Sequence, residues 1–237
     1  MKSVVFQALG QGSENEVLAE EAYKGFLAGL GPNNLRTLFA YIGYLTAKAP
    51  QPLCNEPGER ELLGAAAREF AMIVGPEAAI TRHVQCLSKI SSLNSQDPDV
   101  AIREYRTMLE DCESVGTFSP DTRVPILDEP TLRIVLQLGN AKISYYAKRK
   151  EEVPPPVELL TEARELGERA LQGCEQVMPM FAASASRLIC FAYALQGNTS
   201  ETRRWFDKTC QLFQDDGGSV PTLYGLEDIA QWLGITP

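Results

Sequence analysis

His83 and Cys86 are the residues of this chain whose spacing best fits metal chemistry. His83 is the only histidine among 237 residues, and Cys86 follows it by three positions. Positions three apart share one face of a helix, so the imidazole and the thiol could bind the same ion. A structural zinc site needs about four ligands, however, and the chain has neither a second histidine nor a Cys-x-x-Cys pair. We therefore interpret His83 as a surface or core-edge residue and expect no metal or other cofactor.

Sequence support for catalysis is weak. A Ser–His–Asp or Cys–His hydrolase would have to use His83, and no Gly-x-Ser-x-Gly motif occurs. Gly10-Gln11-Gly12-Ser13 precedes a helix but lacks the strand and the lysine of a phosphate-binding loop. Two acidic groups, Glu110-Asp111-x-Glu113 and Asp215-Asp216, have the composition of a magnesium site. We predict that the chain is not an enzyme, with a small all-helical metal-dependent enzyme as an alternative.

The composition is that of an acidic globular protein. Hydrophobic residues make up 44% of the chain, and the net charge is −9. Broad binding to nucleic acids or anionic membranes requires a basic surface, so we expect neither direct nucleic-acid binding nor membrane insertion. The apolar run near the start is too short for a signal peptide, and none of the six cysteines stands in a Cys-x-x-Cys pair. These features favour a soluble, cytoplasmic protein.

Helix start and stop signals divide the chain into about ten helices. Asn33 or Asn34, and Asp97, precede apolar periodic segments as N-cap residues, and prolines or glycines end most segments. Clear strand alternation occurs nowhere except, weakly, at 3–8. We predict an all-α domain over 13–237 after a leader at 1–12, with irregular connectors at 117–128 and 151–156. The expected helices lie near 13–31, 33–49, 59–74, 76–93, 97–116, 129–150, 157–174, 180–196, 200–214 and 221–234.

One spacing returns five times along the chain. A small residue is followed four positions later by an aromatic or small residue, and three positions later by another that is mostly small or apolar. Offsets of four and three lie on one helix face, where small side chains let a second helix approach closely. The spacing therefore predicts stacked helix pairs. It occurs at Ala22-Phe26-Gly29, Ala66-Phe70-Ile73, Ala101-Tyr105-Met108, Ala163-Gly167-Ala170 and Thr202-Phe206-Thr209.

Residues 188–213, LICFAYALQGNTSETRRWFDKTCQLF, resemble a tetratricopeptide repeat, a helix–turn–helix unit of about 34 residues. Cys190 and Tyr193 match the small and aromatic positions of its first helix, and Gly197-Asn198 matches the turn. Residues 135–141 and 99–110 resemble parts of further units. The resemblance implies a right-handed superhelix of antiparallel helix pairs, an α-solenoid whose first helices line a concave groove.

The same resemblance implies a function in protein binding. In its register the groove residues include a polar asparagine flanked by arginines and apolar side chains, which suits an extended peptide. Leu136 and Leu188 stand where chaperone-tail-binding repeats have lysine and asparagine, so such tails are not the expected ligand. We predict an adaptor or scaffold that binds another protein or peptide. A sensor module for a small signal peptide is a further alternative, and homo-oligomer formation stays open. The implied groove residues are His83, Arg133, Leu136, Asn140, Ser184, Arg187 and Phe191, with Cys86 and Ile90 beside His83.

Overall fold

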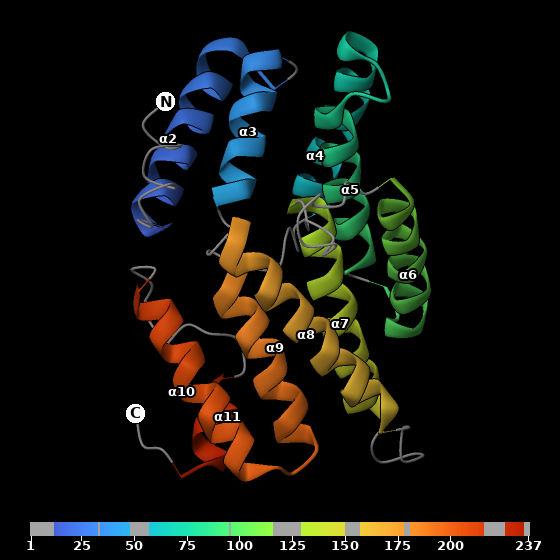
Figure 1. The fold of residues 1–237 in the computed structure, drawn as a ribbon. Coiled ribbons are helices and arrows are strands. Elements are labelled where there is room, and N and C mark those ends of the chain that lie inside the picture. Colours follow the sequence, from blue (N-terminus) through green and yellow to red (C-terminus); the bar gives the residue numbers. More distant parts are fainter. Residues whose placement is uncertain are drawn as a thin grey trace. The chain divides into compact units, whose positions relative to one another are not determined.

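The computed structural model describes residues 12–32, 34–47, 57–94, 96–115, 129–149, 157–177, 181–215 and 226–234. These residues form α-helices and no strand, which confirms the all-α prediction (Figure 1). Residues 1–11 of the expected leader at 1–12 and both expected connectors lie outside the described residues, while Gly12 already belongs to α2. The helices are α2 (Gly12–Leu30), α3 (Leu35–Ala47), α4 (Pro57–Val74), α5 (Ala79–Leu93), α6 (Pro98–Val115), α7 (Glu129–Arg149), α8 (Glu158–Val177), α9 (Ala182–Leu195), α10 (Thr199–Asp215) and α11 (Leu226–Trp232).

The helix ends follow the signals in the sequence. The side chains of Asn34 and Asp97 accept hydrogen bonds of 3.0 Å from backbone amides two residues later, which caps α3 and α6. Gly31 and Gly197 have φ of +80° and +73°, a left-handed conformation that glycine adopts at helix ends. Turn chemistry in the sequence therefore determines where these helices begin and end.

The start of α5 differs from the expected one. The sequence predicts a helix from residue 76, whereas α5 begins at Ala79. Gly75 has φ of +94°, and the hydroxyl of Thr81 donates a 2.8 Å hydrogen bond to its carbonyl oxygen. This bond holds residues 75–78 in a turn, so Pro76 lies in that turn rather than at the first helical position.

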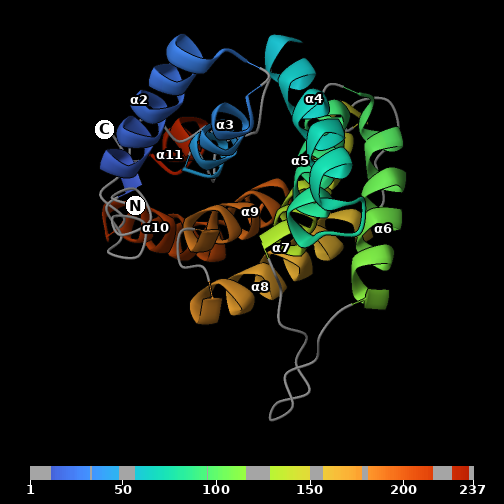
Figure 2. The same ribbon diagram turned by 90° about the horizontal axis from the view of Figure 1, so that it is seen from above.

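The chain divides into two compact units, Met1–Ser95 and Gln96–Pro237, which we call unit 1 and unit 2. The sequence predicts a single repeat domain over 13–237. In unit 1, α2 packs against α3 and α4 packs against α5, as Figure 2 shows. Tyr23 of α2 contacts Tyr41 and Tyr44 of α3, with ring centroids 4.9 and 6.1 Å apart. Phe39 of α3 meets the buried Phe70 of α4 edge to face at 4.7 Å.

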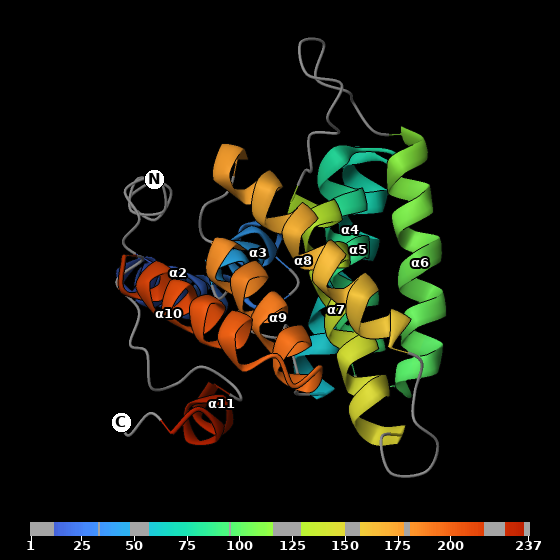
Figure 3. The same ribbon diagram turned by 60° about the horizontal axis from the view of Figure 1, so that its bottom comes forward.

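In unit 2 each helix from α6 to α9 packs against the next one in the chain, as Figure 3 shows. Beyond these neighbours, α9 also contacts α7 and α11. The α7–α9 contact joins helices two apart in the chain, as stacked helix hairpins do. Glycines bring the helices close, because a Cβ at Gly139 would lie 2.3 Å from Cδ2 of Leu188 and one at Gly167 would lie 2.6 Å from Cγ1 of Ile189.

The recurring small-residue spacing is buried in three of its five places. All three residues at Ala101-Tyr105-Met108 and at Ala163-Gly167-Ala170 are buried, and so are Thr202 and Thr209 around the half-buried Phe206. In α4, Ala66 and Phe70 are buried while Ile73 is 54% exposed. The expectation of a buried seam is wrong at Ala22-Phe26-Gly29, where all three residues are exposed. There the face of α2 that packs against α3 is the adjacent one, which carries Ala19 and Tyr23.

Candidate functional site

The contact between Gly139 of α7 and Leu188 of α9 sets the geometry of the candidate site. The two helices run in the same direction, with α8 as the return helix between them in the chain (Figure 1). Successive residues turn about 100° around a helix. Asn140 follows Gly139 and Arg187 precedes Leu188, so both side chains lie on the same side of the α7–α9 contact.

That side is the one facing away from α8. Ile189, on the other flank of Leu188, packs against Gly167 of α8. Lys142, three positions after Gly139, bonds to Glu162 of α8. Asn140 and Arg187 therefore lie opposite the side that α8 covers, on the face that the repeat register assigns to the groove.

Five residues make up what we call the α7–α9 face. Asn140, Arg187 and Phe191 are half-buried, and Phe191 also packs against the cluster of Cys190, Leu226 and Ile229. Ile143 is half-buried and Ser144 is exposed, and both follow Asn140 by about one turn. The face thus combines an amide, a guanidinium and a hydroxyl with two apolar side chains. It consists of Asn140, Ile143, Ser144, Arg187 and Phe191.

The N-terminal ends of α7 and α9 continue this face but are buried. Leu136 is 6% exposed, Ser184 is 7% exposed and Arg133 is 4% exposed. The Arg133 guanidinium lies 5.0 Å from the centroid of the Phe181 ring, a cation–π contact. These three residues lie on the same side of the helices as Asn140 and Arg187, but their burial leaves the accessible part of the face to residues from 140 onward in α7 and from 187 onward in α9.

The remaining predicted residues belong to unit 1. His83 and Cys86 of α5 are half-buried, and Ile90 is fully buried. Within the described residues, no three or more His, Cys, Asp and Glu side chains are gathered as metal ligands would be. Among the acidic candidates, Glu110 and Asp111 are exposed and Glu113 forms an ion pair with Arg169 of α8. Asp215 ends α10, and Asp216 lies outside the described residues.

A second polar group, which the sequence reading missed, links α6, α7 and α8. The ammonium of Lys142, whose side chain is only 2% exposed, donates a hydrogen bond to Oε2 of Glu162. Nη2 of Arg106 donates to the same oxygen at 3.1 Å. The bond from Lys142, with the help of Arg106, lowers the pKa of the Glu162 carboxyl. The sequence does contain a signal for this group, namely a lysine where the repeat has an aromatic residue. Lys142 stands three positions after Gly139, as Tyr193 stands three positions after Cys190 in the unit at 188–213.

The thiol of Cys190 lies inside the α9–α10 contact. Its Sγ donates to the backbone oxygen of Thr202 at 3.5 Å, and burial raises its pKa to about 12. Burial also raises the pKa of the Cys210 thiol on α10. Raised pKa values keep both groups protonated near neutral pH, so neither is an activated nucleophile. Cys190 acts here as a small packing residue.

Comparison of the chain with protein-family models, with curated proteins and with solved structures gives no match. Within the described part of the chain, every helix is too short or too polar to cross a lipid bilayer.

Proposed function

We propose that this chain is a protein-binding module that holds a segment of another protein against the α7–α9 face. One observation carries the proposal: Asn140 and Arg187 come from different helices and lie on the same side of the Gly139–Leu188 contact. A partner segment crossing that contact would meet both side chains at once. In this proposal unit 2 is a tetratricopeptide-like α-solenoid with right-handed stacking, and the protein acts as a cytoplasmic adaptor.

The chemistry of the face suits a polypeptide. The Asn140 amide can donate to and accept from a peptide backbone, and the Arg187 guanidinium can donate to a carboxylate or to carbonyl oxygens. Ile143 follows Asn140 and Phe191 follows Arg187 by about one helical turn, and both offer half-buried apolar surface beside these polar groups. A few directional polar groups beside apolar ones are typical of surfaces that recognise peptide segments.

The rigidity of the scaffold supports the same function. Leu188, Ile189 and Ala185 are buried at 1% exposure or less, so the backbone of α9 beneath the face is fixed by packing. A preformed surface loses little conformational entropy when it binds a partner, so less of the binding free energy is lost. The face is therefore a built surface rather than a collection of mobile side chains.

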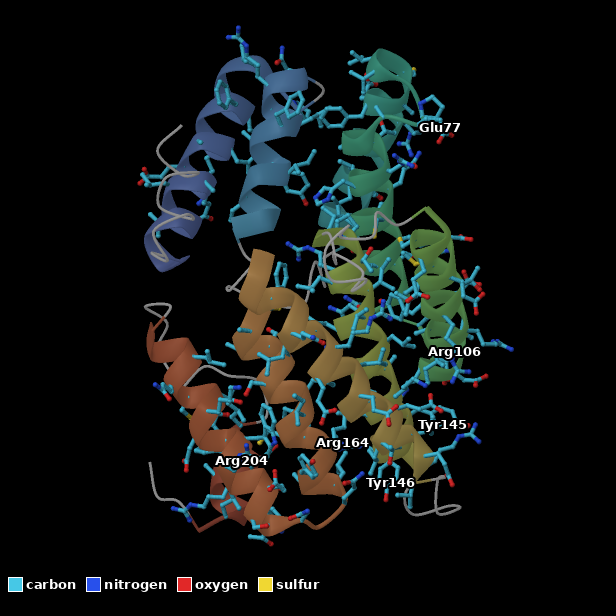
Figure 4. The ribbon with its side chains drawn as sticks, viewed as in Figure 1. Glu77, Arg106, Tyr145, Tyr146, Arg164 and Arg204 are labelled. Carbon is cyan, nitrogen blue, oxygen red and sulfur yellow. The ribbon has the colours of Figure 1, made fainter. Side chains whose placement is uncertain are left out.

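Affinity capture from an extract of the native cells tests the proposal. Three forms of the full chain serve as bait: the wild type, the Asn140→Ala/Arg187→Glu variant and the Arg204→Glu variant. Arg204 lies on α10, outside the face, and its side chain is 73% exposed, so it is a matched charge reversal (Figure 4). We expect a protein captured by the wild type and by Arg204→Glu to be lost from the double variant. Circular dichroism confirms that each bait is folded, and equal capture by all three would contradict the proposal.

A further inference from the structure

Unit 1 exposes an unusual number of large apolar side chains at one end, and they serve no purpose in the proposed peptide site. Phe26 is 38% exposed, Leu30 46% and Phe39 48%. On α4, three consecutive residues are exposed: Met72 at 71%, Ile73 at 54% and Val74 at 49%. Clusters of exposed large hydrophobic residues mark interaction surfaces. We call these six residues the apolar end of unit 1.

The six residues belong to one region of the unit. The Thr37 hydroxyl of α3 donates a 3.2 Å hydrogen bond to the carbonyl oxygen of Phe26, which ties the end of α2 to the start of α3. Phe39 contacts Phe70, which lies two residues before Met72. Leu30 ends α2 and Val74 ends α4, and Figure 4 shows Glu77, in the turn after α4, at the same end of the unit as the turn between α2 and α3. These contacts link α2 to α3 and α3 to α4 at this end of the unit.

Charge distribution indicates what covers this region. Residues 25–35 and 70–76 contain no charged residue. Unit 1 holds eight basic and nine acidic residues, whereas unit 2 holds 14 basic and 22 acidic ones. Contact between two copies through unit 2 would bring two acidic surfaces together, while contact through unit 1 would not.

The charges that border the apolar end complement one another. Arg36, which follows the uncharged stretch at 25–35, is exposed on α3, and Glu77, which follows the stretch at 70–76, is exposed after α4. A two-fold axis places the same patch on both copies, so the α3 side of one copy can face the α4 side of the other. That arrangement brings Arg36 of each copy toward Glu77 of the other.

We propose that the apolar end of unit 1 is a homodimer interface, in which a second copy of this chain covers Phe26, Leu30, Phe39 and Met72–Val74. Burial of the apolar side chains drives association, and the Arg36–Glu77 pairs at the rim select the two-fold arrangement. This surface belongs to unit 1 and the α7–α9 face belongs to unit 2, so a dimer would carry two copies of the peptide-binding face.

Analytical ultracentrifugation of the full chain at up to about 100 µM tests the proposal, since a stable dimer must have a dissociation constant well below that concentration. We expect a dimer for the wild type, and at least about a tenfold weaker dimer for Ile73→Glu, because the new carboxylate must be desolvated in an apolar contact. Val157→Glu is the control, since Val157 is an apolar residue of unit 2 that is 60% exposed. It should leave the dimer unchanged.

Mixing two variants tests the arrangement. Arg36→Glu and Glu77→Arg each place like charges opposite one another and should each weaken self-association, whereas an equimolar mixture should form heterodimers with both pairs restored. A wild type that stays monomeric, a dimer that Ile73→Glu leaves intact, or a mixture that is no tighter than its components would overturn the proposal. Hydrogen exchange of the wild type provides a readout independent of variant folding: amides at 70–74 should exchange more slowly at higher protein concentration, and unchanged exchange would also overturn it.

Discussion

Arg169 of α8 and Glu113 of α6 form an ion pair in which Nη1 and Oε1 lie 2.7 Å apart. Seven residues earlier on both helices, Arg106 pairs with Glu162 at 3.1 Å, with the charges exchanged between the helices. The offset between the partners is 56 residues in both pairs. The two pairs therefore link α6 and α8 in one register, on the side of α7 remote from the α7–α9 face.

This charge pattern predicts that the stability lost by reversing a charge on one helix is recovered by reversing its partner's charge on the other helix. Arg169→Glu should lower the free energy of unfolding by about 0.5–1 kcal/mol, because the pair is partly exposed and screened. Glu113→Arg in the same chain should recover most of that loss. Urea unfolding of the two single variants and the double variant forms the required thermodynamic cycle. Strictly additive losses would show that the pair contributes nothing.

The Lys142–Glu162 pair predicts an asymmetric response to mutation. Glu162→Ala leaves the buried Lys142 ammonium without its main partner and should cost about 1–3 kcal/mol, less than for a fully buried pair because Glu162 is 45% exposed. Lys142→Met keeps the shape and removes the buried charge, so it should be neutral or stabilising. Thermal unfolding compares the two variants. Equal losses of stability would contradict the view that Glu162 is the main partner of the buried Lys142 ammonium.

The lowered pKa of Glu162 predicts an acid-dependent part of the stability. A carboxyl whose pKa is lower in the folded state stabilises the fold above its unfolded pKa, near 4.5, and this contribution is lost as the pH falls through the folded value. The stability gap between the wild type and Glu162→Gln should therefore be constant from about pH 6 to 7 and shrink below about pH 4. Urea midpoints measured across that range provide the check, and a gap that widens in acid would have the wrong sign.

The Gly139–Leu188 contact predicts the response to an added methyl group. A Cβ at residue 139 would lie 2.3 Å from Cδ2 and 3.2 Å from Cγ of the buried Leu188, so Gly139→Ala must push α7 and α9 apart or force Leu188 to repack. We expect a loss of about 1–3 kcal/mol. Gly43→Ala is the control, because a Cβ there meets nothing within 4 Å and should gain about 0.5–1 kcal/mol from helix propensity. Similar changes in the free energy of unfolding for the two variants would exclude close helix contact at Gly139.

Much of the fold is readable from the sequence because local chemistry determines it. Caps at Asn34 and Asp97 and the glycine at Gly197 fix helix ends through contacts within a few residues, so the expected boundaries match closely there. The predicted start of α5 at residue 76 was wrong because the Thr81 hydroxyl bonds to the carbonyl oxygen of Gly75 and holds a turn there. Pro76 by itself fits either a turn or the first turn of a helix. Periodicity also identified which faces of α6, α8 and α10 are buried.

Burial along a helix could not be predicted in the same way. The repeat register placed Arg133, Leu136 and Asn140 on one face of α7, yet only Asn140 keeps partial exposure, because burial depends on what packs against each turn. For the same reason Ala22-Phe26-Gly29 carries the packing spacing and is exposed. Lys142 is the opposite case, a residue expected to be exposed that is buried. A lysine in a sequence predicts a solvent-exposed side chain, and only the structure shows that Glu162 pairs with this buried one.

Site-specific photocrosslinking from Ser144 tests most directly whether the α7–α9 face binds a partner. Ser144 is an exposed residue of the face, and Glu168 is an exposed residue of α8, on the opposite side of the α7–α9 contact. With a photoreactive residue at either position in the native cell extract, we predict an adduct to a second protein from position 144 that disappears when Arg187→Glu is added, and none of that species from position 168. Equal adducts from both positions, or one from 168 alone, would contradict the account.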